Sequence, residues 1–174
     1  MKIFERTVKE ILKPFTRNGI DYCIIGGLAV IVSGVRRGTA DFDIVIPKEK
    51  FEKAIEVIYN QEFKLITDID DKKNKLYYCE TVDQAIAYVK ITMPKAIKIN
   101  KGGFNGLFGD IWLKTVIPFE KLNQRAKKYK LYNEQIRIVA IDDLIKLKKS
   151  AGRPVDKQDI YELGLLKRKS KKKG

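Results

Sequence analysis

Residues 21–47 read DYCIIGGLAVIVSGVRRGTADFDIVIP, two apolar runs separated by a glycine pair and a short polar segment. Its apolar runs 21–26 and 41–46 are typical of buried β-strands, and Gly26-Gly27 marks the turn into a short helix over 27–34. A turn from a strand into a helix presents free backbone N–H groups, which favour an anion together with the helix dipole. The stretch therefore predicts a strand–helix–strand unit with a turn suited to phosphate.

Two acids, Asp41 and Asp43, open the second strand of this unit. Alternate side chains of a strand share one face, so both acids point together while Phe42 points the other way. Such a pair suits hard divalent cations, and acids that lead into the buried run 44–46 are costly unless a cation receives them. A lone glycine pair is usually only a turn, and a lone Asp-x-Asp is usually a solvated strand end. Their conjunction instead indicates phosphoryl or nucleotidyl transfer.

Length and composition agree with one small domain, which we expect in the cytoplasm. The chain has 174 residues, of which 44% are hydrophobic, and it shows neither a membrane-spanning apolar run nor a signal-peptide pattern. Cys23 and Cys79 lie in apolar runs and are expected to be reduced core residues. The chain has no histidine, which excludes a Ser-His-Asp triad and histidine metal ligands. Any chemistry must therefore use carboxylates, lysines, arginines and metal ions.

The charge balance is strongly basic. Lys and Arg number 36 against 22 Asp and Glu, a net charge of +14, and the last eight residues, KRKSKKKG, hold six of the positive charges. This field favours a polyanionic partner such as RNA. The alternative is that a lysine-rich surface reflects genome composition or a hot habitat. Residues 167–174 are predicted to form a disordered basic tail.

The rest of the chain is predicted to alternate between helices and strands. Helices are expected over 4–17, 48–60, 81–90, 118–128, 141–150 and 155–166. Strands are expected over 63–67, 75–80 and 107–115, with a hairpin over 130–139. Residues 91–105 show no clear element, and their glycines favour a hairpin turn over a mobile loop above the site.

The expected fold class is α/β (α+β), with a small mixed β-sheet packed against helices and a helical segment at the C-terminus. Residues 1–166 are expected to form a single domain, with a core over about 1–116 and the C-terminal hairpin and helices over 117–166.

Gly-Gly, a gap and Asp-x-Asp at the start of an apolar strand resemble the DNA polymerase β-type nucleotidyltransferase superfamily. Two further stretches are similar to its small prokaryotic members related to the AbiEii-type nucleotidyltransferases: RRGTA at 36–40, and AIDDLIKLKKSAGRPVDKQDIYEL at 140–163. Between them, FGDIWL supplies Asp110 as the third acid of the superfamily pattern. The resemblance implies a nucleotidyltransferase fold.

The resemblance also implies roles for individual residues. Asp41, Asp43 and Asp110 would bind Mg²⁺ or Mn²⁺ and act in catalysis, with Asp110 taking up the proton of the attacking hydroxyl. Glu80 and Asp83 are the alternatives for the third acid. The implied nucleotide-binding residues are Gly26, Gly27, Arg36, Arg37, Thr39, Lys148, Arg153, Asp156 and Asp159.

Two points within that set stay open. A guanidinium beside the acids would clamp phosphate oxygens, but the sequence does not say whether Arg36 or Arg37 faces the site. A salt-bridge network that joins two helices is an equal explanation for Lys148, Arg153 and the aspartates that follow them. Asp142 and Asp143 are better explained as acids at a helix N-terminus than as ligands.

Two classes of function remain open. The first is a nucleotidyltransferase that moves NMP from an NTP substrate to an acceptor hydroxyl on RNA or tRNA, on a protein, or on a small molecule such as an aminoglycoside. Within it, the resemblance makes the toxin of a toxin–antitoxin pair plausible, with an antitoxin as partner. The second class is a non-catalytic nucleotide- or RNA-binding module that keeps the fold. Three retained acids argue against a pure binder, which gains little from negative charge near phosphates.

Overall fold

The computed structural model describes residues 3–171, with side chains described up to residue 169. The chain begins with a helical arm, defined here as α1 (Ile3–Thr7), the π-helical η1 (Val8–Leu12) and α2 (Lys13–Arg17), which follow one another directly. The sequence predicts this arm as a helix over 4–17. Its buried stripe consists of Val8, Ile11, Leu12 and Phe15.

The strand–helix–strand unit forms as predicted, with slightly shorter strands. It consists of β1 (Cys23–Ile25), α3 (Gly26–Val32) and β2 (Asp41–Val45). β1 and β2 pair antiparallel, with Ile25 opposite Asp43. The N-terminus of α3 therefore lies beside the acids of β2.

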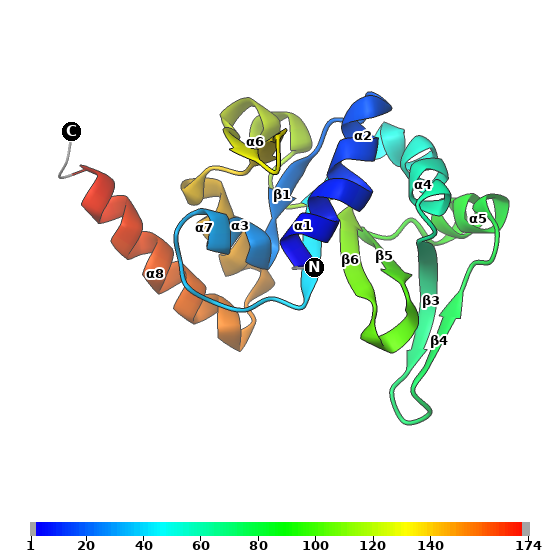
Figure 1. The fold of residues 1–174 in the computed structure, drawn as a ribbon. Coiled ribbons are helices and arrows are strands. Elements are labelled where there is room, and N and C mark those ends of the chain that lie inside the picture. Colours follow the sequence, from blue (N-terminus) through cyan, green and yellow to red (C-terminus); the bar gives the residue numbers. More distant parts are fainter. Residues whose placement is uncertain (1–2, 172–174) are drawn as a thin grey trace.

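These strands belong to a mixed eight-stranded sheet of order β4-β3-β5-β6-β2-β1-β8-β7 (Figure 1). β2 pairs parallel with β6 and β1 pairs parallel with β8, while the other neighbours are antiparallel. The remaining strands are β3 (Lys64–Asp70), β4 (Lys75–Tyr78), β5 (Ala96–Lys101), β6 (Leu107–Trp112), β7 (Lys127–Leu131) and β8 (Glu134–Ile138). A mixed sheet packed against helices is the predicted fold class.

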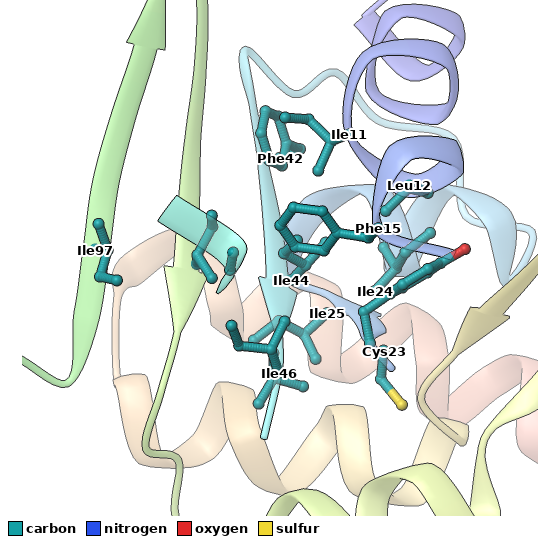
Figure 2. Close-up of a cluster of buried hydrophobic side chains, with 14 of the residues drawn as sticks. Ile11, Leu12, Phe15, Cys23, Ile24, Ile25, Phe42, Ile44, Ile46 and Ile97 are labelled. Atoms are coloured by element: carbon teal, nitrogen blue, oxygen red, sulfur yellow. The ribbon is translucent and has the colours of Figure 1, made fainter. Parts of the chain in front are cut away.

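The two faces of β2 differ, as the alternation of its residues predicts: one face is apolar and buried, and the other carries the acids. Phe42 and Ile44 lie on the side of the helical arm, near Ile11 and Phe15 (Figure 2). A Cβ atom at Gly109 of β6, the partner of Phe42, would come within 2.2 Å of the Phe42 ring, so this position requires glycine. The acids of β2 are left to the opposite face.

Three helices form connections between successive strands. α4 (Phe51–Asn60) follows the 3₁₀ segment η2 (Lys48–Lys50), and α6 (Phe119–Arg125) follows Pro118. α5 (Val82–Thr92) begins with a capping box between Thr81 and Gln84, which satisfies backbone N–H groups at its first turn. These helices agree with the predicted ones, although α6 ends earlier because β7 already begins at Lys127.

Residues 91–105 depart from the prediction by containing a regular strand. β5 pairs antiparallel with β6 along its whole length, and η3 (Gly103–Asn105) closes the hairpin between them. Gly102 and Gly103 both have positive φ, which explains the glycine-rich KGGFNG segment as a tight connection. The preferred hairpin interpretation was therefore right, but it missed the strand that enters the turn.

Two helices end the described chain, α7 (Ile141–Ala151) and α8 (Pro154–Lys171). Gly152, with φ +67°, caps α7 in a left-handed conformation. The disordered tail predicted for 167–174 is wrong for 167–171, where α8 continues and Lys167 contacts Asp142. Residues 172–174 lie outside the described part. Across residues 3–171, no helix combines the length and the apolar character needed to cross a membrane.

Candidate functional site

Three carboxylates gather on the face of the sheet opposite the helical arm. In the parallel pair of β2 and β6, Asp43 is the direct partner of Asp110, so both side chains leave the same face. Asp41 lies two residues earlier on β2 and shares that face. The alternatives for the third acid lie elsewhere: Glu80 forms an ion pair with Lys64 beyond β4, and Asp83 is in the first turn of α5. We define Asp41, Asp43 and Asp110 as the acid cluster.

The turn into α3 is shaped to bring Asp43 and Thr39 close. Gly26 has φ +63°, and a Cβ atom there would lie 1.9 Å from Oδ2 of Asp43. A Cβ atom at Gly27 would lie 2.6 Å from Oγ1 of Thr39. The glycine pair thus leaves the room that the acid and the threonine occupy. Thr39 Oγ1 in turn donates a hydrogen bond of 3.0 Å to Oδ1 of Asp41.

Asp43 carries an unfavourable charge, because its carboxylate is largely withdrawn from water. The pKa of Asp43 is raised to about 6, mainly by burial and to a smaller extent by the negative charges of Asp110 and Asp41. A hydrogen bond from Trp112 and the charge of Arg153 act in the opposite direction. The Trp112 indole Nε1 donates to Oδ1 of Asp43 over 3.1 Å. A positive group placed beside Asp43 would therefore be strongly favoured.

Of the two arginines before the acids, Arg37 turns inward and Arg36 is exposed. Arg37 forms an ion pair with Asp159 of α8, and its Nη2 lies 3.5 Å from the position of a Cβ atom at Gly27. Arg37 therefore ties the loop before β2 to α8 beside the glycine turn.

Lys148 lies at the centre of a buried network of ion pairs. Its Nζ atom lies 2.9 Å from Oδ1 of Asp156 and 2.7 Å from Oδ2 of Asp159, and all three side chains are at most 4% exposed. Arg153 binds Asp156 through Nε at 3.0 Å and Nη2 at 3.2 Å. With Arg37, these residues form what we call the ion-pair network, which joins α7, α8 and the loop before β2. The salt-bridge explanation of the C-terminal motif is therefore correct.

The network also faces the acid cluster through a cavity of about 510 Å³. Arg153 and Lys148 line one side of it, and Gly26, Asp43 and Asp110 line another. A hydrogen bond to Asp156 is the main cause that raises the pKa of Arg153, and the charges of Asp43 and Asp41 contribute, so its guanidinium lies in the field of the acids. The remaining lining is mainly apolar or cationic: Ile25, Trp112, Val116, Leu144, Leu147, Ala151, Lys95, Lys114, Thr115 and Ser150.

Sequence reasoning missed several of these residues. Lys98 of β5, opposite Asp110, lies 3.0 Å from Oδ1 and 3.3 Å from Oδ2 of that acid. The alternation of Ile97, Lys98 and Ile99 was a strand signal, but the glycines that follow obscured it. Asp143 lies in the first turn of α7, as predicted for an acid at a helix N-terminus, and it also accepts two hydrogen bonds of 2.9 Å from Arg125.

The donor set of the acid cluster fits a hard divalent cation. All three groups are carboxylates, and among the described residues neither Asp41 nor Asp43 has an ion-pair partner within 4.0 Å. In the present arrangement of residues 3–171, however, no three acidic or cysteine side chains are close enough to hold one ion together. Asp110 instead engages Lys98.

The fold matches solved structures, whereas no protein-family model and no curated protein matches the chain. The lincomycin-bound lincosamide antibiotic adenylyltransferase LnuA has a TM-score of 0.60 at 14% identity, over 93% of this chain and 97% of that chain. ANT(2″)-Ia in complex with adenylyl-2″-tobramycin has a TM-score of 0.58 at 13% identity, over 98% and 92%. A putative nucleotidyltransferase from Thermotoga maritima has a TM-score of 0.57 at 14% identity, over 93% and 92%. The chain therefore has a nucleotidyltransferase fold.

Proposed function

We propose that this protein is a metal-dependent nucleotidyltransferase that moves NMP from an NTP to an acceptor hydroxyl. The observation that carries the proposal is the pairing of Asp43 with Asp110 on adjacent strands, where both acids line a cavity that Arg153 also lines. Asp41 lies two residues before Asp43 on the same strand face. Carboxylates face cations across a space of about 510 Å³, which suits a nucleotide. The shared fold with two antibiotic adenylyltransferases supports the same chemistry.

In this proposal the acid cluster would hold Mg²⁺ or Mn²⁺, which neutralises the phosphates and polarises the α-phosphate when bound. Arg153 and Lys148 would bind phosphate oxygens from α7 and the loop after it, and Arg37, Thr39, Gly26 and Gly27 would shape the opposite side. The acceptor oxygen attacks the α-phosphorus, the bond to the β-phosphate oxygen breaks and pyrophosphate leaves. The carboxylate of Asp110 takes up the proton of the acceptor hydroxyl. Asp156, Asp159 and the exposed Arg36 would act only through their neighbours or through long-range charge.

For the acceptor we favour an RNA or tRNA end over a cationic antibiotic. Lys95 and Lys114 line the cavity and have no ion-pair partner among the described residues. They adjoin each other because the N–H of Lys114 donates to the carbonyl of Lys95 over 3.1 Å. Unpaired cations attract phosphate and repel a polycationic aminoglycoside. A toxin role with an antitoxin partner rests on the resemblance to AbiEii-related proteins alone.

The direct test is incubation with each α-labelled NTP, Mg²⁺ and either total RNA, total protein or an aminoglycoside. We expect label on RNA, and we expect Asp41→Asn with Asp43→Asn to abolish it while circular dichroism stays unchanged. Label on protein or on the antibiotic would reject RNA as the acceptor. NTP binding without label on any acceptor would instead establish a non-catalytic nucleotide-binding module.

A further inference from the structure

Lys98 touches the acid cluster at a single member, Asp110. β5 and β6 pair antiparallel with Lys98 opposite Asp110, so both side chains leave the same face of the sheet. The ammonium lies 3.0 Å and 3.3 Å from the two oxygens of the carboxylate. Among the side chains of residues 3–169, it is the only cation within 4.0 Å of any of the three carboxylates.

We infer that Lys98 is a positioning residue for Asp110, which competes with a divalent ion for this carboxylate and must swing away when the ion binds. The inference rests on the proposed metal site. A cation that spans both oxygens of Asp110 occupies the lone pairs that a metal ligand needs. An ammonium left in contact with those oxygens would also lie close to the ion and repel it.

The exposure of the two groups favours this exchange. Lys98 is 50% exposed and Asp110 is 21% exposed, so the ammonium can move into water at little cost. Exposed ion pairs contribute little to stability. The main effect of Lys98 should therefore appear in cation binding and not in folding.

Competition for one carboxylate is reciprocal: the bound ion weakens the Lys98–Asp110 contact, and that contact weakens the affinity for the ion by the same factor. Removal of Lys98 must therefore raise the affinity for the ion. Lys98→Met keeps the length of the side chain and removes the charge. Lys95→Met is the matched control, because Lys95 lines the same cavity, carries the same charge and has no ion-pair partner among the described residues. Lys98→Arg keeps the charge and should behave like the unmodified protein.

The experiment measures Mn²⁺ affinity by electron paramagnetic resonance on the full-length chain with a non-hydrolysable NTP analogue. We expect Lys98→Met to bind Mn²⁺ about 3- to 10-fold more tightly, Lys95→Met to change affinity less than about 2-fold, and Lys98→Arg to restore the original value. Addition of Mn²⁺ should also raise the Tm of Lys98→Met by more than that of the unmodified protein.

An equal gain in Lys95→Met would overturn the inference, since the effect would then be general charge and not competition at Asp110. The variant Asp110→Asn separates this failure from that of the proposed function. If Asp110→Asn weakens Mn²⁺ binding and Lys98→Met does not strengthen it, only the inference about Lys98 is wrong. If Asp110→Asn leaves Mn²⁺ binding unchanged, Asp110 is not a metal ligand and the proposed role of this acid fails as well.

Discussion

The acid cluster and the ion-pair network each contribute two residues to the lining of one cavity, but their buried carboxylates differ in whether cations compensate them. In the network, burial alone would raise the pKa of Asp156, but hydrogen bonds from Arg153 and Lys148 hold it below its ordinary value. In the cluster, burial and two neighbouring acids raise the pKa of Asp43 to about 6. Compensated charges hold a structure together, whereas uncompensated like charges cost stability unless a ligand arrives. The difference indicates that the buried, paired aspartates of the network stabilise the structure, whereas the acids of the cluster are left to bind a cation.

The largest expected effect is on chemistry, within the cluster. Asp110→Ala should lower kcat by about 10²–10⁴-fold, the usual contribution of a general base. The affinity for NTP should change little, because Arg153 and a divalent ion on the other two acids would still bind the phosphates. Equilibrium binding of a fluorescent NTP and single-turnover transfer would measure the two quantities separately. Glu80→Ala is the control, and a loss of turnover there with full activity in Asp110→Ala would transfer the role to Glu80.

The network should show the reverse pattern, in which stability changes first. Lys148→Met leaves Asp156 and Asp159 buried without their shared cation, and removing one partner of a buried ion pair costs about 3–5 kcal/mol. Urea unfolding without nucleotide measures this free energy. Lys149→Met, an exposed neighbour on α7, should cost less than about 0.5 kcal/mol.

Restoring charge balance tests the reason for that loss. The triple variant Lys148→Met, Asp156→Asn and Asp159→Asn removes the buried charges together, and should recover a large part of the stability that Lys148→Met loses. A triple variant as unstable as the single one would mean that packing of the lysine stem, and not charge, holds α8 in place.

A smaller effect is expected from pH on Asp43, measured with EDTA present. The pKa of Asp43 is about 6 in the folded protein against an ordinary 3.8, so the folded state binds more protons than the unfolded state between these values. The free energy of unfolding therefore falls as pH rises from about 3.8 to about 6. Above about pH 6, the buried charge of Asp43 destabilises the folded protein by its full amount. Asp43→Asn removes the penalty, and should be more stable than the unmodified protein at pH 7 by on the order of 1–3 kcal/mol. This advantage should vanish towards about pH 4, and an advantage independent of pH would contradict the assigned cause.

The sequence predicted the cluster better than its surroundings. Strand alternation placed Asp41 and Asp43 on one face, because alternation is a property of a single strand. Asp110 was supplied by the superfamily resemblance. The pairing of Lys98 with Asp110 depends on which strands become neighbours, and that follows from the whole sheet. The choice between Arg36 and Arg37 likewise depended on Asp159, over a hundred residues away in the sequence.

The C-terminus shows the same limit. A run of basic residues with few apolar side chains predicts disorder. In the structure, however, Lys167 lies on the same helix as the buried Leu163 and contacts Asp142 of α7. Tertiary contacts thus stabilise the helix beyond residue 166, where the prediction from composition ended it.

The smallest expected effect concerns charges that belong to neither region, in the last part of the chain. Deletion of 168–174 removes five positive charges and keeps the contact of Lys167 with Asp142. If RNA is the acceptor, each lost phosphate contact should flatten the dependence of log affinity on log salt by about 0.7–0.9, and KM for RNA should rise modestly. KM for NTP should stay the same, because Lys148 and Arg153 are untouched. Substitution of Arg168 and Lys169 by Gln tests charge without shortening α8. An unchanged salt dependence in both variants would remove these residues from RNA binding and leave Lys95 and Lys114, on the cavity wall, as the cations that receive the acceptor.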